Sequence, residues 1–248
     1  MVKNSIILEI EKLLDNKKIL DYNILSDSFG INCLKIETED KERYIVKYYY
    51  KKESRFNAIK SEADNILFLN SHKFNFFPKI INNNNKFLIM SFIDNDNNLP
   101  IKTNDDLLGA IISLHSKRSN NYGFNFDTQI GGLKQSNPKS KNWVEFYRDK
   151  RLHYIFDLIN KNQPMDKAIN TKLELLLKKI HNFIPNKPKP SLLHGDLWEG
   201  NILFKNKKFS GFIDPGSFYG HNELEVSYLR WFNPKFIDRN FLDKYNDH

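Results

Sequence analysis

Cysteine is nearly absent from this sequence, and it has no long apolar run. Cys33 is the single cysteine among 248 residues, which excludes an intramolecular disulfide and a zinc cluster built from cysteines. No window approaches the roughly 18 consecutive apolar residues that a membrane-spanning helix needs. Residues 1–14 carry Glu9 and Glu11 and no cleavage-site pattern, so they predict an amphipathic helix and not a signal peptide. We therefore expect a cytoplasmic protein with no membrane partner.

Acidic residues are outnumbered by basic ones, and glycine is sparse. The chain has 38 Lys and Arg against 30 Asp and Glu, a formal net charge of +8, and 10 glycines. A positive surface favours anions such as nucleotides, phosphorylated metabolites or nucleic acid. The lysines are scattered and form no recognisable nucleic-acid motif, so we expect no nucleic-acid partner. With 40% hydrophobic and 27% charged residues, the composition is that of an ordinary globular protein.

The first third of the chain predicts a sheet interrupted by one helix. Short segments rich in β-branched and aromatic residues predict strands, a helical period predicts one helix, and the asparagine run 82–85 predicts a turn. The expected strands are 21–29, 32–38, 44–49, 79–81 and 86–93, and the expected helix is 53–69. This order of elements is that of the small lobe of a kinase.

The remainder of the chain predicts mostly helices. Helices are expected at 103–115, with Thr103 as N-cap, at 143–159 and at 166–183, and short strands at 191–193, 202–204 and 209–213. The fold class is therefore α+β, a two-lobed protein-kinase-like fold. We expect a nucleotide-binding lobe at residues 1–94 and a catalytic and substrate lobe at 95–248, with the boundary in the polar stretch 95–98.

The densest chemical signal lies between two of these short strands. Asp196 is followed five positions later by Asn201, and Asp214 ends the next predicted hairpin. In kinases an Asp at the first position accepts the proton of the attacking hydroxyl, and an Asn and a second Asp hold magnesium. A cap and a polar loop residue would explain one such position, but three at this spacing predict phosphoryl transfer.

Two histidines have simpler interpretations. His194 could be a general base or a metal ligand, but its place just before Asp196 favours a structural role in which the ring bonds backbone. His115 lies near a predicted helix end and is expected to be satisfied by its neighbours.

Lys47 lies inside an apolar predicted strand and needs a counter-charge. Glu62, on the following predicted helix, is the favoured partner, as in the kinase arrangement in which such a pair binds nucleotide phosphates. Glu53 and Asp64 are rival partners. A lysine that extends to solvent from an edge strand is the alternative.

The expected nucleotide-covering loop, residues 26–32, contains one glycine, Gly30, where many kinases have three. Small polar residues can also turn tightly and present backbone N–H groups to phosphate. We expect nucleotide contacts from Ser28 in this loop and from Met90 and Phe92 in the 86–93 strand.

Longer stretches resemble the fructosamine kinase family, also called ketosamine-3-kinases, which are relatives of aminoglycoside phosphotransferases and choline kinases. The catalytic loop alone does not choose among these relatives. The resemblance runs from about Tyr22 to Phe232, and its most specific parts are Phe124–Asp127 with Ile130-Gly131 and Gln135–Asn137, the segment Trp143–Leu152, and Asp214-Pro215 with Phe218–His221 and Glu223.

This resemblance implies ATP and Mg²⁺ as cofactors and phosphorylation of the 3-hydroxyl of a ketosamine, either a small molecule or a glycated protein lysine. It implies Asp196 as base, Asn201 and Asp214 on metal, and Lys47 with Glu62 on phosphates. Trp198 is expected either to support a sugar face or to wedge the catalytic loop against the core. For Arg148, Lys150 and Arg151, a solvated helix face is the favoured interpretation.

Two other functions stay open. The chain could be another small-molecule kinase, acting on an aminoglycoside, choline or a related alcohol. It could also be a nucleotide-binding pseudo-enzyme, because its loop is poor in glycine and it ends at His248, where the family usually continues with further helices. Either the large lobe is minimal, or the natural C-terminus lies further on. The preferred sugar and the oligomeric state are not predicted.

Overall fold

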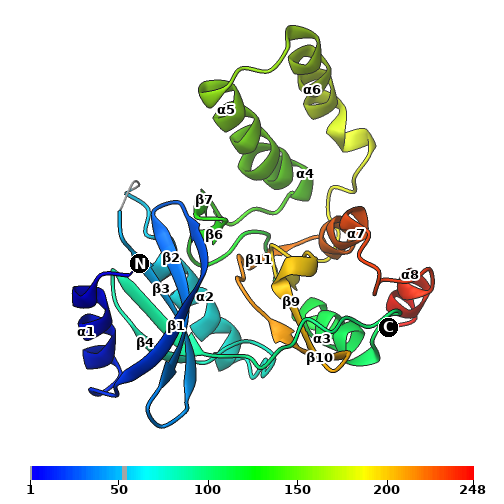
Figure 1. Cartoon of the computed structure of the whole chain (residues 1–248). Helices are drawn as coiled ribbons and strands as arrows, with labels where there is room; N and C mark the ends of the chain where they lie inside the picture. The colour runs from blue at the N-terminus through cyan, green and yellow to red at the C-terminus, as the bar shows by residue number, and fades with distance from the viewer. Residues whose placement is uncertain (1, 52–54) are drawn as a thin grey trace.

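Alternating apolar residues build the N-terminal part of the molecule around one antiparallel sheet. The computed structural model describes residues 2–51 and 55–248 (Figure 1). The strand order is β1-β2-β3-β5-β4, so β1 and β4 lie at the edges. The elements of this part are α1 (Asn4–Leu13), β1 (Ile19–Ser28), β2 (Ile31–Thr38), β3 (Arg43–Tyr49), α2 (Ala58–Ser71), β4 (Ile80–Asn83) and β5 (Phe87–Ser91).

The period of two along β2, β3 and β5 separates two apolar clusters, one on each face of the sheet. Leu34, Val46 and Ile89 pack with Ile10 and Leu14 of α1. On the other face, Leu88 and Met90 pack with Ile59, Ala63 and Ile66 of α2. The predicted strands and the amphipathic N-terminal helix are thereby confirmed, and α1 and α2 lie on opposite sides of the sheet (Figure 1).

Two predicted boundaries in this part differ from the structure. Helix α2 begins at Ala58, not at Glu53, because Asn57 is extended and its side chain accepts a hydrogen bond from the Lys60 amide as N-cap. Glu53 itself lies outside the described residues. The asparagine run turns only at its end, since β4 continues to Asn83 and Asn84 Oδ1 then accepts from the Lys86 and Phe87 amides.

The C-terminal part is mostly helical, with short two-stranded ladders between the helices. Predicted helix 143–159 is a single rod in which a π-helical turn joins two α-helical segments, and α5 and α6 form an antiparallel pair that projects from the rest (Figure 1). The elements are α3 (Asp105–Ser116), β6 (Thr128–Ile130), β7 (Leu133–Gln135), α4 (Trp143–Tyr147), the π-helix (Arg148–Leu152), α5 (His153–Asn162), α6 (Lys167–Lys179), β8 (Ser191–Leu193), β9 (Ile202–Lys205), β10 (Lys208–Phe212), β11 (Phe218–Gly220), α7 (Asn222–Phe232) and α8 (Phe241–Asn246).

The sequence analysis predicted neither the β6–β7 hairpin nor β11, α7 and α8. Strands of three residues are too short to show a period, and α8 spans only six residues. Within the described residues, no helix has both the length and the apolar character that crossing a membrane requires.

The two parts meet at an aromatic core. Phe76 and Phe77, which follow α2, pack on Phe212 of β10, and the Phe212 amide donates to the Phe76 carbonyl at 2.8 Å. The chain crosses between the two parts in residues 92–104, which form no helix or strand. The predicted boundary after residue 94 falls inside this connection. The core therefore anchors the sheet to the elements that carry Asp196 and Asp214.

The N-cap of α3 is Asn104, and the prediction of Thr103 is wrong by one residue. Asn104 Oδ1 accepts from the amides of Asp106 and Leu107 at 3.1 and 3.2 Å. The buried Thr103 hydroxyl is committed elsewhere, because it accepts from the Asp238 amide just before α8. A tertiary contact thus takes the side chain that local sequence offers as a cap.

We expect Asn104→Ala to lower the free energy of unfolding by about 1 kcal/mol, because two amides of the first turn lose their acceptor. Urea denaturation of the purified protein measures this loss. The exposed neighbour Lys102 provides the control, and Lys102→Ala should change stability by less than about 0.5 kcal/mol. Equal effects of the two substitutions would contradict the assignment of the cap.

Candidate active site

The loop between β8 and β9 presents Asp196 on a tightly turned backbone. Gly195 has φ +89°, and a Cβ built there would lie 2.1 Å from the Gly216 carbonyl oxygen. Only glycine fits this close approach. The amide of Gly216 in turn donates to the His194 carbonyl at 2.9 Å, so the segment that carries Asp214 is tied to the segment that carries Asp196.

Asp196, Asn201 and Asp214 converge as the spacing predicted. Asn201 Nδ2 donates to the Asp196 carbonyl at 2.8 Å and to its carboxylate at 3.2 Å. The Ile213 amide donates to the Asn201 carbonyl at 3.1 Å, which places Asp214 next to the loop. Asp214 has φ +55°, a left-handed conformation that is uncommon for a residue with a side chain. Strain of this kind is common at functional sites.

The surroundings make Asp196 a better proton acceptor than a free carboxylate. Burial raises the pKa of Asp196 to about 6, and the nearby charge of Asp214 adds to the rise. Hydrogen bonds from Asn201 and Tyr228 to the carboxylate lower the pKa and oppose part of this effect. At neutral pH the carboxylate therefore stays mainly ionised, with a raised affinity for a proton.

Lys47 of β3 lies between two carboxylates. Its Nζ donates to both oxygens of Glu62 on α2, at 2.7 and 2.9 Å, and to Asp214 Oδ1 at 2.6 Å. Lys47 and Glu62 are buried, whereas the Asp214 side chain is 40% exposed. Burial alone would lower the pKa of Lys47, but Asp214 and Glu62 outweigh it and raise that pKa, so the lysine is cationic.

The pairing of Lys47 with Glu62 excludes the alternatives considered from sequence. Lys47 does not extend to solvent, and Asp64 pairs instead with Lys60 on its own helix at 2.9 Å. Glu53 lies outside the described residues. The structure thus brings together the five residues predicted for catalysis, metal and phosphate: Lys47, Glu62, Asp196, Asn201 and Asp214.

The other predicted nucleotide contacts lie apart from this cluster. Ser28 is exposed at the end of β1, beside the Phe29-Gly30 turn. Met90 is buried against α2 in the apolar cluster of that face. The Phe92 ring is covered by Lys35 at 4.6 Å and by Arg43 at 4.7 Å. Nucleotide contact at these three positions stays a prediction.

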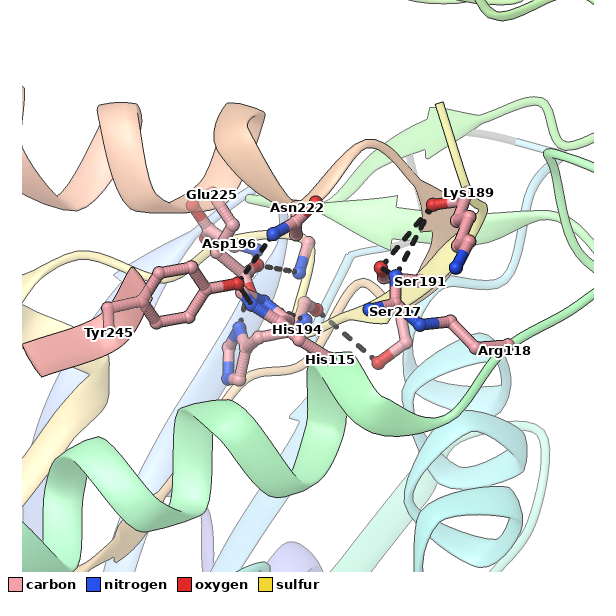
Figure 2. Close-up of polar contacts among 11 residues, drawn as sticks. His115, Arg118, Lys189, Ser191, His194, Asp196, Ser217, Asn222, Glu225 and Tyr245 are labelled. Carbon is pink, nitrogen blue, oxygen red and sulfur yellow. Dashed lines mark hydrogen bonds and ion pairs between the residues drawn. The ribbon is translucent and has the colours of Figure 1, made fainter. Parts of the chain in front are cut away.

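A buried carboxylate on α7 holds the backbone of the catalytic loop. Glu225 accepts from the amides of His194 and Gly195, at 3.0 and 2.7 Å, and contacts His115 Nε2 at 2.9 Å. His115 Nδ1 lies 2.7 Å from the hydroxyl of Tyr245 on α8. Figure 2 shows these side chains converging beneath the loop from α3, α7 and α8. The loop that positions Asp196 is therefore held by three helices.

Both histidine interpretations agree with the structure. The His194 ring accepts the Asp196 amide at Nδ1 and bonds the Ile213 carbonyl through Nε2, so it bridges the two segments of the site. Burial lowers the pKa of His194 and keeps the ring neutral. His115 is satisfied by Glu225 and Tyr245, as expected from its place near the end of α3.

Sequence analysis missed Glu225 and singled out Glu223 two positions earlier. The Glu223 side chain is 75% exposed, whereas Glu225 is 4% exposed. The two residues are about 200° apart around a helix, so they cannot face the same side. The buried neighbours Val226 and Leu229 mark the inner face of α7, and a helical period through them would have selected Glu225.

Arg151 corrects the expectation of a solvated helix face. Its Nη1 donates to the Ser136 carbonyl at 2.9 Å, and the guanidinium lies 4.1 Å from the centre of the Phe218 ring. Its Nε is buried without a partner in the described residues. Arg148 does face outward and pairs with Asp149. The π-helical turn re-aims the rod so that Arg151 packs inward.

Trp198 combines the two roles considered for it. It is 36% exposed, its ring lies against Gly200, and its centre is 5.7 Å from that of Phe232 on α7. It therefore braces the catalytic loop and leaves part of its ring open beside Asp196.

A cavity of about 840 Å³ opens next to the catalytic loop. Gly195 and Leu197, which flank Asp196, contribute to its wall, and so does Tyr228 of α7. Helices α5 and α6 form the opposite wall with aliphatic side chains that include Ile159, Leu173 and Leu176.

The sequence model of the fructosamine kinase family matches residues 9–248. The chain belongs to the fructosamine kinase family. Among curated family members, the chloroplastic protein-ribulosamine 3-kinase of Arabidopsis thaliana is 35% identical over 161 residues, which cover 62% of this chain and 48% of that protein. The ketosamine-3-kinase of Mus musculus is 39% identical over 106 residues, 43% of this chain and 34% of that protein. The chain thus spans about half the length of these relatives, or less.

Solved structures show that this family member has the two-lobed protein-kinase-like fold expected from its sequence. A structure assigned to a fructosamine-3-kinase of Thermobifida fusca superposes with a TM-score of 0.80 at 20% identity, covering 99% of this chain and 83% of that one. An ADP-bound aminoglycoside phosphotransferase superposes with a TM-score of 0.64 at 18% identity, covering 100% and 83%. At these identities the likeness establishes the fold.

Glu225→Ala should lower the free energy of unfolding by about 3 kcal/mol or more, because the His194 and Gly195 amides and His115 lose a buried partner. The matched control is Glu223→Ala on the same helix, expected within about 0.5 kcal/mol of the unaltered protein. Urea denaturation compares the two. Similar losses from both would mean that Glu225 does not hold the loop.

The contribution of Glu225 should also depend on pH. Burial opposes its charge, but the hydrogen bond with His115 and the other contacts outweigh burial and lower the pKa of Glu225 from 4.5. Because the folded pKa is depressed, the stabilisation is present above pH 4.5 and is lost as pH falls through the folded pKa. The stability difference between the unaltered protein and Glu225→Gln should thus shrink below pH 4.5. A constant difference between pH 3 and pH 7 would contradict this.

Proposed function

We propose that this protein transfers the γ-phosphoryl group of ATP to the 3-hydroxyl of a ketosamine. The observation that carries the proposal is the convergence of Asp196, Asn201, Asp214 and the Lys47–Glu62 pair in one site of a fructosamine kinase family member. Phosphoryl transfer needs alignment and charge neutralisation more than covalent chemistry, and these residues supply both. The relatives named ribulosamine and ketosamine 3-kinases support the choice of acceptor.

Asp196 is the proposed general base. Its carboxylate accepts the proton of the sugar 3-hydroxyl as that oxygen forms a bond to the γ-phosphorus and the bond to the leaving ADP oxygen breaks. The raised pKa of Asp196 brings its proton affinity closer to that of the developing alkoxide while leaving the group ionised at neutral pH. The Asn201 amide holds the carboxylate in place during this step.

The nucleotide phosphates are proposed to lie against Lys47. The lysine is fixed by Glu62 and already contacts Asp214, so its charge is oriented toward the site before ATP arrives. The half-exposed Asp214 carboxylate and the Asn201 side-chain oxygen, whose amide nitrogen is turned toward Asp196, are hard oxygen ligands of the kind that Mg²⁺ prefers. A magnesium ion held there would neutralise phosphate charge. The ADP-bound phosphotransferase of the same fold supports ATP as the donor.

Trp198 is the proposed platform for the sugar. Its exposed part lies two residues from Asp196 on the same loop, and an aromatic face can pack on the apolar face of a sugar ring. The contacts with Gly200 and Phe232 restrict the ring, so little side-chain freedom is lost when the substrate binds.

The cavity wall favours a ketosamine over an aminoglycoside. Aminoglycosides are polycations, and their recognition requires several carboxylates. Among the described residues that line the cavity, Glu225 is the sole carboxylate, and it is committed to His115 and to two loop amides. Arg151 adds positive charge. A nucleotide-binding pseudo-enzyme is disfavoured because the proton-accepting and metal-binding groups are all in place. The cytoplasmic location, the absence of a nucleic-acid partner and the oligomeric state were not tested by the structure, and the first two stay predictions.

ATP consumption with Mg²⁺ against ribulosyl-lysine, fructosyl-lysine, kanamycin and choline tests the proposal. We expect turnover on a ketosamine and none on kanamycin or choline. Asp196→Asn should lower that turnover by about 10²–10⁴-fold, because it removes the proton acceptor and keeps the shape of the side chain. Circular dichroism confirms that the variant is folded. Turnover on kanamycin alone would replace the proposed acceptor, and ATP binding with no turnover on any acceptor would favour the pseudo-enzyme.

A further inference from the structure

The cavity beside the catalytic loop has a wall that suits neither a sugar nor a nucleotide. Most of the described residues that line its 840 Å³ are aliphatic or aromatic, and its two charged groups are already engaged, Arg151 with backbone and aromatic rings and Glu225 with His115 and the loop. Sugar hydroxyls and phosphates placed there would lose hydrogen bonds to water without replacement. An apolar group would gain by leaving water.

The position of the cavity relates it to the acceptor substrate. Gly195 and Leu197 belong both to the cavity wall and to the segment that carries Asp196, whereas Lys47 and Asp214 are not among its lining residues. The cavity therefore opens on the acceptor side of Asp196, away from the groups proposed to hold ATP. In a ketosamine the amine substituent is carried on C1, two carbons from the 3-hydroxyl. A sugar with its 3-hydroxyl at Asp196 thus directs the substituent into neighbouring space.

We propose, resting on the ketosamine kinase function above, that this cavity is a subsite for the amine-derived part of the substrate and selects adducts of apolar amines. The wall formed by α5 and α6 makes the selection. Leu173, Leu176 and Leu177 lie at helical spacing i, i+3 and i+4 on α6, and Ile155 and Ile159 lie at i and i+4 on α5, so both helices turn an aliphatic face toward Tyr228 and Trp231 of α7. A volume near 840 Å³ is within the range of small-molecule pockets.

The first experiment compares ribulosyl adducts of methylamine, hexylamine and 2-phenylethylamine on the unaltered protein. The hexyl and phenylethyl adducts should have kcat/KM at least about 10-fold above the methyl adduct, mainly through a lower KM, because their substituents leave water. Equal kcat/KM for all three would overturn the subsite and leave the ketosamine kinase function intact. No turnover of any of them would overturn both.

A matched pair of variants on α6 locates the effect. Leu176 lines the cavity and Leu175 does not, yet the two are adjacent and similarly exposed, at 44% and 50%. Leu176→Lys should reduce the preference for hexyl over methyl to about threefold or less, because a charge then faces the apolar substituent. Leu175→Lys should keep both the preference and the basal activity. Loss of preference in both variants would overturn the assignment to this wall.

Two further measurements guard the interpretation. If Leu176→Lys does not fold, Ile159→Lys on α5 addresses the same wall and should remove the preference in the same way. Sedimentation of the unaltered protein with and without ribulosyl-hexylamine tests whether a second copy of the chain occupies the cavity instead. A dimer that Leu176→Lys converts to monomer, without an apolar preference in the unaltered protein, would overturn the proposal in favour of a subunit interface.

Discussion

One buried cation, Lys47, links the parts of the molecule that must act together. Its counter-charges come from α2 and from the segment after β10, so the sheet, the helix behind it and the C-terminal part each contribute one member of the cluster. A lysine taken out of water is unfavourable unless it is paired and hydrogen-bonded. The fold that buries Lys47 must therefore also deliver Glu62 and Asp214. This requirement couples the closure of the two parts to the assembly of the site.

The second constraint is the backbone of the catalytic loop. A segment that turns at Gly195 and approaches Gly216 closely has amides that no strand or helix can satisfy. Glu225 satisfies two of them, and its own charge is stabilised through His115, which in turn contacts Tyr245 (Figure 2). Helix α8 is thereby connected to the position of Asp196 through hydrogen bonds only. Stability and geometry of the site depend on the same buried network.

The site and the cavity divide the chemistry between them. Charged and hydrogen-bonding groups gather where phosphate and the reacting hydroxyl are proposed to lie, and the neighbouring wall of α5, α6 and α7 is apolar. The inward turn of Arg151 at the π-helix shapes the boundary between these regions, because it fixes α4 to the segment after β7. In this family member the polar site is suited to the reaction, and the apolar wall is suited to the choice of acceptor.

The sequence by itself determined the elements with a strong period and the residues of the catalytic motif. The strands β1 to β3, the helix α1 and the trio Asp196, Asn201 and Asp214 follow from patterns that extend over a few residues, and local physics fixes such patterns. The tertiary structure alone decided between partners that look equivalent in sequence. It selected Glu225 over Glu223, gave Thr103 to Asp238 and left the cap to Asn104, and brought Lys47 to Asp214 across 167 positions. Those outcomes depend on which face of a helix is buried and on which distant segment packs against it, and neither is encoded within a short stretch of the chain.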